Sequence, residues 1–570
     1  MSTLPISEVA GQPLTGEQTQ YLTGFFAGAA ARGLKFGDVE PVPAPATRVS
    51  LDDLILEERI KRELHPLDAY PVLLEHASAN KAPDKEDLFR FKWNGLFFLT
   101  PNKEAYMARL RIPGGVLQTY QLREIAAVAK ELTTGYIQIT TRANLQIRLI
   151  QPKDAPAVLT RIQHVGLHTR GSGADNIRNL TANPTAGIDP AELIDVLPYC
   201  REMGQIILND RSFYDLPRKF NIAYDGGGLI GTVEDTNDIG AKAVKVGDEI
   251  FFRIALGGAT GHKAFARDSG ILVKPAELNK VIAAMVRVYI ANGNRGDRKK
   301  ARLKHLLETW TLDQFIAETE KLLGYPLTKQ PLDETAIRHA SQELAHTHVG
   351  VYPQKQPGLH YVGVAIPVGL INPKQLLRVA EIADLYGSGE IRLTVWQNFI
   401  IPNVPEAFVS TVKKALKKIG FATEQSHVRS GLIACTGNSY CKLAQANTKD
   451  AATELADYLD KKVRLDQPVN IHVTGCPNSC AQHYMGDIGL LGTRIKINGE
   501  SMDGYHVFVG GGFGKHQAVG RQVFASLSLE SLKRTVEKML LVYLAQREPG
   551  ETFQAFTARH DLNTLQVLFS

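Results

Sequence analysis

The sequence has 570 residues, only five of which are cysteine, and it lacks several signals that would narrow its function at once. No apolar run is long enough to span a membrane, and no segment has the pattern of a nucleic-acid-binding module. The first residues show neither a secretory leader nor an Arg/Ser-rich transit leader. We therefore expect a cytoplasmic protein with reduced thiols that binds neither membranes nor nucleic acid. The absence of a C-x-x-C-H motif excludes a covalently attached c-type haem.

Two glycine clusters, at 226–228 and 510–514, lack the strand, G-x-G-x-x-G turn, helix and acidic residue of a dinucleotide site. We interpret them as places where the backbone comes close to a bound group. The net charge of +6 fits an acidic partner or an anionic ligand, although an ordinary, slightly basic surface has the same charge. The length implies three or more domains.

Four of the five cysteines form two pairs in one short stretch: Cys435 and Cys441, then Cys476 and Cys480. A disulfide fits poorly with reduced thiols, and the five-residue gap of the first pair is wide for a zinc site. A [4Fe-4S] cluster needs wider ligand spacing, and soft thiolates suit iron and sulfide. The spacing favours the cluster over the other two. Cys200 stands apart and is expected to be a plain buried thiol.

The sequence contains an internal repeat at an offset of 254 residues. Ile112 matches Ile366 and Asn144 matches Asn398, with no gap between them. Other identical pairs are Pro113/Pro367, Gly115/Gly369, Gln121/Gln375, Gly135/Gly389 and Thr140/Thr394. A repeat of this length predicts duplicated halves related by a pseudo-two-fold axis.

The two copies differ where charge is concerned. Gly363 stands at the position of Arg109, and Trp396 stands at that of Arg142. The segment around Lys219 corresponds to a position just before Cys476. We infer that the first half meets an anion, that the second half holds the metal group, and that one site is built from both.

Local patterns predict several elements. Residues 22–31, 51–64, 118–132 and 450–462 are expected to be helices, and 135–150 a strand. Residues 41–45, which alternate Pro with small residues, are expected to form an extended linker.

Four segments of the first half carry cations within strand-like or loop-like patterns, at Arg109, Arg142, Arg178 and Lys219. A single such residue is usually a solvated surface charge. Several cations inside apolar strand patterns need anionic partners, which can be acidic side chains or a ligand.

Together, the C-x5-C pair, the later G-C-P-N-S-C segment and these cation segments closely resemble the sirohaem- and cluster-containing nitrite and sulfite reductases. The resemblance extends from about residue 105 to the end. It implies a mixed α+β (α/β) fold of duplicated halves with pseudo-two-fold symmetry. The expected domains are an N-terminal lead with short helices (1–90), a first ferredoxin-like half-domain (91–155), a first sirohaem-binding α/β domain with the substrate cations (156–335), a second ferredoxin-like half-domain (336–406) and a second α/β domain with the cluster (407–570).

The resemblance also implies roles for individual residues. The four paired cysteines would bind the [4Fe-4S] cluster, and the sulfur of Cys480 would also ligate the sirohaem iron. Sirohaem carries eight carboxylates, which require Arg and Lys partners. Residues that match substrate-face positions are Arg109, Arg178 and Lys219, and those that match macrocycle-contacting positions are Arg142, Gln146 and Asn478.

Asn221 separates the two branches of the family, because the sulfite enzymes generally place a second Lys there and the nitrite enzymes place Asn. Sulfite is mostly a dianion near neutral pH and nitrite is a monoanion, so one cation fewer is reasonable. We therefore expect a monomeric assimilatory nitrite reductase that takes electrons from reduced ferredoxin or flavodoxin. A ferredoxin-dependent sulfite reductase and a non-catalytic iron–sulfur electron-transfer or sensor protein are the alternatives.

Overall fold

The structure is a computed structural model that describes residues 51–101, 104–330 and 348–570, together with 8–9, 12–13, 15–16 and 19. The chain forms two compact units, Met1–Leu54 and Ile55–Ser570. In the first unit, β1 (Glu8–Val9) pairs antiparallel with β2 (Gln12–Pro13). The helix predicted at 22–31 and the linker at 41–45 lie outside the described residues. Apart from residues 51–54, all that follows concerns the second unit.

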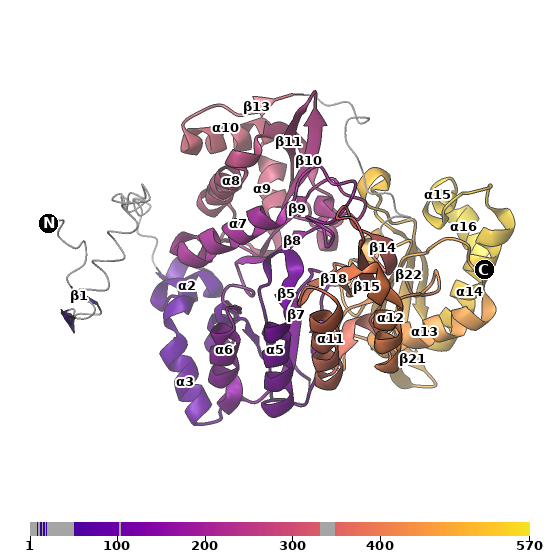
Figure 1. Cartoon of the computed structure of the whole chain (residues 1–570), viewed down its shortest axis with the longest axis horizontal. Helices are drawn as coiled ribbons and strands as arrows, with labels where there is room; N and C mark the ends of the chain where they lie inside the picture. The colour runs from indigo at the N-terminus through magenta and orange to yellow at the C-terminus, as the bar shows by residue number, and fades with distance from the viewer. Residues whose placement is uncertain are drawn as a thin grey trace. The chain divides into compact units, whose positions relative to one another are not determined.

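The sequence repeat folds into two five-stranded antiparallel sheets, several of whose strands are labelled in Figure 1. The two sheets exchange an edge strand. The first sheet has the order β16 (Leu370–Ile371), β6 (Ile137–Ile139), β7 (Leu145–Ile150), β4 (Tyr106–Arg109), β3 (Leu96–Phe97). The second has the order β14 (Gly350–Pro353), β15 (Leu359–Val364), β18 (Phe399–Pro405), β17 (Glu390–Leu393), β5 (Val116–Gln118). Each copy therefore supplies the last strand of the other copy's sheet.

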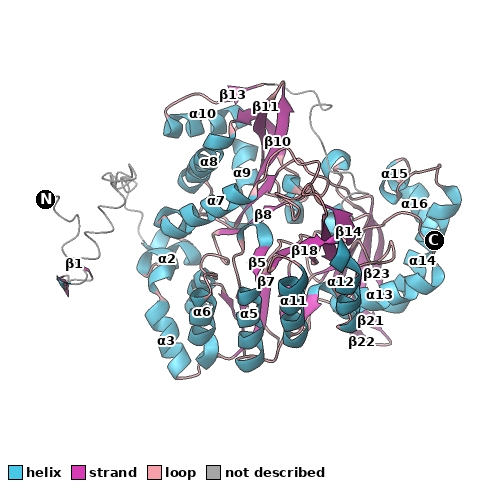
Figure 2. Ribbon diagram, in the orientation of Figure 1, coloured by secondary structure: helices cyan, strands magenta, loops and turns pink. Residues whose placement is uncertain are grey.

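A row of helices covers these two sheets along one side (Figure 2). In order of contact the row consists of α3 (Tyr70–Ser78), α6 (Ala155–His164), α5 (Thr119–Glu131), α11 (Pro373–Tyr386) and α12 (Val409–Lys418). Helix α5 turns its apolar stripe, which includes Leu122 and Ile125, into a core shared with Val379 and Ile382 of α11. The two halves of the repeat therefore bury one continuous core.

Two further sheets repeat the same strand plan. The first has the order β8 (Ile177–Ala182), β9 (Phe220–Asp225), β10 (Ile239–Val246), β11 (Glu249–Leu256), β12 (Arg267–Val273), β13 (Thr328–Lys329). The second has the order β19 (Leu432–Ala434), β20 (Ile471–Thr474), β21 (Ile488–Ile497), β22 (Glu500–Val509), β23 (Arg521–Leu527). In both, the first three strands are parallel and the later pairs are antiparallel.

Equivalent helices follow equivalent strands in the two halves. Helix α7 (Leu197–Asn209) joins the first two strands of one sheet, and α13 (Lys449–Lys462) joins those of the other. Helices α8 (Leu278–Asn292) and α14 (Leu529–Gln546) follow β12 and β23. The duplication predicted from the repeat is therefore confirmed. The other α-helices of the described residues are α2 (Leu56–Glu63), α4 (Lys85–Arg90), α9 (Leu303–Thr309), α10 (Leu312–Leu323), α15 (Phe553–Ala558) and α16 (Leu562–Phe569).

Two local predictions need correction. The strand predicted at 135–150 is two strands, β6 and β7, because residues 140–144 form a turn between them. Thr140 N–H donates to the Asn144 carbonyl at 2.9 Å, and Ala143 adopts a left-handed conformation with φ of 46°. The helix predicted at 51–64 is a short 3₁₀ turn (Leu51–Asp53) followed by α2, because Ile55 has a non-helical ψ of 153°.

The helices predicted at 118–132 and 450–462 are confirmed within one residue at each end as α5 and α13. The boundaries of the five expected domains stay predictions. Among the described residues, none of the helices has both the length and the apolar character needed to cross a membrane.

Candidate functional site

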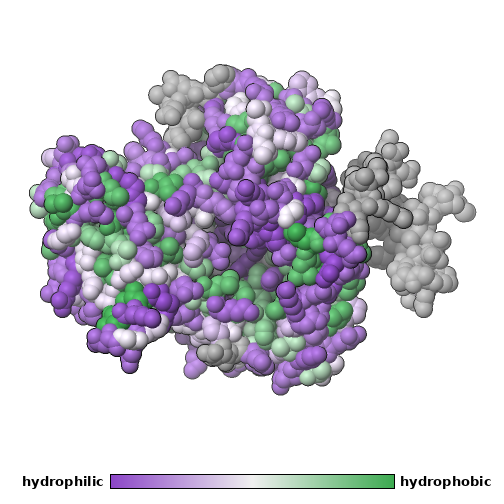
Figure 3. Space-filling model, turned by 180° about the vertical axis from the view of Figure 1, so that it is seen from behind, coloured by the Kyte–Doolittle hydropathy of each residue, from purple (hydrophilic) through white to green (hydrophobic). Residues whose placement is uncertain are grey.

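A cavity of about 530 Å³ lies between the two halves of the larger unit. Its volume is within the range of pockets that enclose small ligands and cofactors. The surface seen from behind is hollowed near its middle, where hydrophilic residues gather (Figure 3). All the predicted site residues line the cavity: Arg109, Arg142, Gln146, Arg178, Lys219, Asn221, Cys435, Cys441, Cys476, Asn478 and Cys480.

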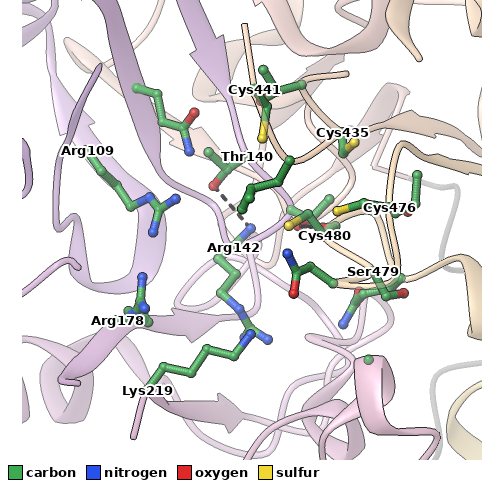
Figure 4. A pocket seen from close by; sticks show the side chains of 18 of the residues that line it. Arg109, Thr140, Arg142, Arg178, Lys219, Cys435, Cys441, Cys476, Ser479 and Cys480 are labelled. Carbon is green, nitrogen blue, oxygen red and sulfur yellow. Dashed lines mark hydrogen bonds between the residues drawn. The ribbon is translucent and has the colours of Figure 1, made fainter. Parts of the chain in front are cut away.

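The cations and the cysteines lie on opposite sides of the cavity (Figure 4). Arg109 ends β4, Arg142 stands in the turn between β6 and β7, Arg178 is in β8 and Lys219 directly precedes β9. The cations thus come from two sheets of the first half.

The described residues that line the cavity make a strongly cationic wall and include no acidic side chain. Two of its arginines have buried partners: Arg302 is paired with Asp238 at 2.7 Å, and Arg218 with Asp175 at 3.6 Å. Seven cations line the wall, and the other five of them form no ion pair with a carboxylate in the described part of the chain. Since partly buried cations need counter-charges, the cavity suits a ligand with several negative charges. The seven cations are Arg109, Arg142, Arg148, Arg178, Arg218, Lys219 and Arg302.

Backbone carbonyls hold two of these arginines in place. Arg109 stacks 4.4 Å above the Phe97 ring and donates to the Ser172 carbonyl at 3.4 Å. Arg178 donates to the Ser172 and Ala174 carbonyls at 3.4 and 2.8 Å, while its buried Nε finds no hydrogen-bond acceptor among the described residues. Both side chains are therefore oriented without being neutralised.

Burial lowers the pKa of Lys219 and of Arg142 in the pocket. It brings the pKa of Lys219 to about 7, with repulsion from Arg302 as the next cause and attraction to the Cys480 sulfur opposing it. The pKa of Arg142 falls to about 10 for the same two reasons. An anion bound in the cavity would hold Lys219 in its protonated form.

Asn221 is buried behind Arg142. With its side-chain amide oriented to satisfy both atoms, its oxygen accepts from Arg142 Nη2 at 3.3 Å and its nitrogen donates to the Phe220 carbonyl at 3.2 Å. Its backbone N–H donates to Asp238 Oδ2 at 2.9 Å, and the same carboxylate holds Arg302. Asn221 therefore orients Arg142 within a buried polar network.

Gln146 and Arg148 lie on the same face of β7, two residues apart. Arg148 donates to Gln146 Oε1, to Gln138 Oε1 at 3.2 Å and to Thr436 Oγ1 at 2.7 Å. Thr436 directly follows Cys435, so Arg148 joins a strand of the first half to a cysteine loop of the second.

The cysteine loops follow the carboxyl ends of two neighbouring parallel strands. Cys435 directly follows β19, and Cys476 and Cys480 are in the loop after β20. Parallel strands end at the same edge of a sheet, which brings the two pairs together although 34 residues separate Cys441 from Cys476. Gly475 N–H donates to Cys435 Sγ at 3.2 Å.

Cys480 is the exposed member of the second pair, while Cys476 is buried. The Cys480 carbonyl accepts a hydrogen bond from Thr141 Oγ1 at 2.9 Å, so Cys480 is tied to the turn that carries Arg142. Ser479 and Gln482, on either side of it, have left-handed φ angles of 51° and 55°. The His483 ring lies 2.9 Å from Ser479 Oγ and helps to hold this strained loop.

The four sulfurs fit an iron–sulfur cluster better than a disulfide or a single metal ion. All five cysteines are free thiols. Among the described residues, no three His, Cys, Asp or Glu side chains are close enough to bind one ion. Burial, followed by the neighbouring Cys480 sulfur, raises the pKa of Cys435 to about 11, so a thiolate there needs a cationic partner such as iron. Soft thiolates at this wider spacing suit a cluster.

The sequence predictions missed Arg148, Arg218 and Arg302. Arg148 could have been found from its position two residues after Gln146 on one strand face. Arg218 directly precedes Lys219. Arg302 ends a basic run that has the pattern of a solvated surface, and only its pairing with Asp238 reveals that it is buried.

The glycine clusters at 226–228 and 510–514 do not line the cavity. They approach other backbone instead: a Cβ at Gly226 would lie 2.3 Å from the Ile194 carbonyl oxygen, and one at Gly511 would lie 2.4 Å from that of Gly486. Close packing against backbone accounts for Gly226 and Gly511, and contact of these clusters with a bound group stays a prediction.

A duplicated fold that sets four cysteine sulfurs opposite a carboxylate-free wall of cations defines a redox protein with an anionic prosthetic group. The sequence matches the nitrite and sulphite reductase 4Fe-4S domain over residues 173–327 and 426–565. It matches the nitrite/sulfite reductase ferredoxin-like half domain over residues 100–165 and 352–419. The chain therefore belongs to the nitrite and sulfite reductase family, and the expected fold class is confirmed.

Similar proteins cover nearly the whole chain. A ferredoxin–nitrite reductase of Synechococcus elongatus is 35% identical over 79% of this chain and 89% of its own length. Another, from Leptolyngbya laminosa, is 35% identical over 86% of this chain and 97% of its own. The structure of the Mycobacterium tuberculosis NirA protein has a TM-score of 0.84 and 29% identity, covering 90% of this chain and 97% of that one.

Proposed function

We propose that this chain is an assimilatory nitrite reductase that takes electrons from ferredoxin and reduces nitrite to ammonium. The observation that carries the proposal is the cavity, whose described lining sets seven cations and no carboxylate opposite four cysteine sulfurs. Relatives named ferredoxin–nitrite reductase, at 35% identity over most of the chain, support nitrite as the substrate and ferredoxin as the donor.

The chemistry of the cavity fits both prosthetic groups of the family. Cys435, Cys441, Cys476 and Cys480 would hold a [4Fe-4S] cluster, and the exposed sulfur of Cys480 would also reach the sirohaem iron. The carboxylates of sirohaem match the pocket cations, among them Arg142, and Gln146 and Asn478 would contact the macrocycle. When bound, the two groups supply single electrons and an iron site for the nitrite nitrogen.

The pocket residues would stabilise charge and deliver protons. Conversion of nitrite to ammonium takes up six electrons and eight protons and releases two water molecules. Arg109 and Arg178, fixed by carbonyls, would stabilise negative charge on the nitrite oxygens. Lys219, with its pKa lowered to about 7, suits the donation of protons near neutral pH.

Asn221 supports nitrite over sulfite as the substrate. Its neutral amide accepts a hydrogen bond from Arg142 and adds no charge to the wall. A site for a monoanion needs less positive charge than a site for a dianion. We propose further that the enzyme is a cytoplasmic monomer and that flavodoxin can replace ferredoxin as the donor.

The test is to purify the loaded protein, measure its iron, sulfide and sirohaem spectrum, and compare initial rates on nitrite and sulfite with a reduced dye. We expect a higher kcat/KM for nitrite. Preference for sulfite would favour the sulfite reductase alternative, and a preparation that contains only zinc would contradict the whole proposal. A fully loaded protein that reduces neither anion would support an electron-transfer or sensor role.

A further inference from the structure

A buried lysine lies beside the cysteine loops and has no part in the reaction proposed above. Lys449 is the first residue of α13 and is only 5% exposed. Its Nζ donates to the carbonyls of Val368 and Ala434, the second at 3.3 Å. Ala434 directly precedes Cys435, so the ammonium group lies against the segment that carries this sulfur.

Three features make a cation costly at this position. The side chain is removed from water. It stands at the amino end of a 14-residue helix, where the helix dipole disfavours positive charge. Arg148 adds a like charge nearby. A charged lysine at a position with these three unfavourable features needs a negatively charged group nearby.

The partner is the group at Cys435. Within the described residues, no carboxylate forms an ion pair with Lys449. Burial lowers the pKa of Lys449 from 10.5 to about 7, and the attraction that opposes this shift comes first from the Cys435 sulfur and then from the exposed Asp450. A more negative group at Cys435, such as a bound cluster, would raise this pKa again and keep the lysine charged. The same sulfur accepts from Gly475 N–H at 3.2 Å, and Thr448 Oγ1 donates to the Cys435 carbonyl at 2.7 Å. Residues 448 and 449 thus direct positive charge and hydrogen bonds toward one cysteine.

We propose that Lys449 is a positioning residue that raises the reduction potential of the cluster by fixing a buried positive charge beside Cys435. The inference rests on the proposed function, since it requires the cluster to be present. An added electron makes the cluster more negative, and a fixed cation in a medium of low dielectric constant favours that state. Two carbonyl acceptors prevent the ammonium group from turning away.

A purely structural role is the competing explanation. The two hydrogen bonds join the turn Pro367–Gly369 to the end of β19, and an uncharged donor could make them equally well. The two explanations differ in what happens when the charge is removed and the length of the side chain is kept.

The experiment is a redox titration of the loaded enzyme, followed by electron paramagnetic resonance of the reduced cluster. In Lys449→Met, the ratio of reduced to oxidised cluster at a fixed ambient potential should fall about tenfold, which is ~59 mV for a one-electron couple. Lys449→Arg keeps the charge and should stay within about threefold of the wild type. Lys442→Met, which removes an exposed lysine one residue after Cys441, is the matched control and should also change little.

An unchanged ratio in fully loaded Lys449→Met would overturn the proposal and leave the lysine a structural tether. An equal fall in Lys442→Met would overturn it too, because any nearby surface charge would then suffice. If the Met variant fails to fold, Lys449→Gln, which keeps a hydrogen-bond donor, is expected to show the same tenfold fall. Wild-type protein without iron and sulfide would contradict the proposed function itself.

Discussion

Replacing Lys219 by Met tests the proton-delivery step proposed for the pocket. The lysine side chain points into the cavity (Figure 4) and forms no ion pair with a carboxylate in the described part of the chain. Met has a similar length and no charge, so the shape of the wall is kept while one cation is removed. Loss of one donor that stabilises charge in a transition state typically lowers kcat by about 10²–10³-fold, roughly 3–4 kcal/mol. We expect a fall of that size, with a smaller change in KM.

The pH dependence separates a catalytic role from a structural one. The pKa of Lys219 is lowered from its ordinary 10.5 to about 7 by burial and by Arg302, and the carboxylates of a bound sirohaem would raise it again. The lysine is therefore protonated on the acid side of an inflection between 7 and 10.5 and neutral above it. Because kcat/KM follows ionisation of the free enzyme, it should fall across that inflection in the wild type but not in Lys219→Met.

The assay is the initial rate of nitrite reduction with a reduced dye, from pH 6 to about 10. Lys130→Met, at an exposed position near the end of α5, is the control for loss of one positive charge and should behave as the wild type does. The reasoning fails if Lys219→Met keeps the alkaline fall, or if its kcat drops by less than about threefold.

Three further changes have defined outcomes. Asn221→Lys adds a cation beside Arg142, so kcat/KM for nitrite should fall at least about tenfold relative to kcat/KM for sulfite. If the ratio of these two constants does not change, other residues set the preference. Cys441→Ser should lower the iron content of the purified protein. Cys200→Ser, which changes a fully buried thiol outside the cavity, should leave the iron content unchanged. An equal loss of iron in both variants would contradict the assignment of the ligands. Asp235 has its pKa raised from 3.8 to about 7 by burial and by Glu234, so the stability it adds is complete below its unfolded pKa and is lost as the pH rises through 7. The free energy of unfolding, measured with urea, should therefore fall between about pH 4 and 7 and level off above that, and Asp235→Asn should reduce the fall.

The parts of the site that could be predicted from sequence are those fixed by spacing and repetition. The matched residues of the repeat have the same structural task in both copies. Gln121 closes the capping box of α5, and Gln375, at the same offset, closes that of α11. The cysteines could be grouped by their close spacing in two pairs, whereas the neighbouring strands that bring the pairs together are seen only in the structure. These patterns are local, so they are readable without the fold.

The residues that escaped prediction depend on long-range packing. Arg302 stands in the sequence Arg298–Arg302, which looks like a solvated basic run, yet it is 4% exposed because the carboxylate of Asp238 holds it in the wall. The role of Asn221 in orienting Arg142 depends on a neighbour 79 residues away in sequence. Such contacts between distant residues leave no periodic pattern in the sequence. These contacts nevertheless decide which cations face the ligand.

The turn at residues 140–144 and its copy at residues 394–398 have different roles in the two halves of the chain. In the first copy, the turn carries Arg142 into the cavity. In the second, Trp396 stands at that position and packs 5.4 Å from Phe513. Its neighbour Gln397 exchanges hydrogen bonds of 3.0 Å with the N–H and carbonyl of Ala434, and donates at 3.2 Å to the Ile139 carbonyl of β6. The second turn therefore anchors the strand that leads into Cys435 to a strand of the first copy. Through Gln397 the segment that leads into Cys435 is joined by hydrogen bonds to the strand that precedes the Arg142 turn, although the two come from opposite halves of the chain.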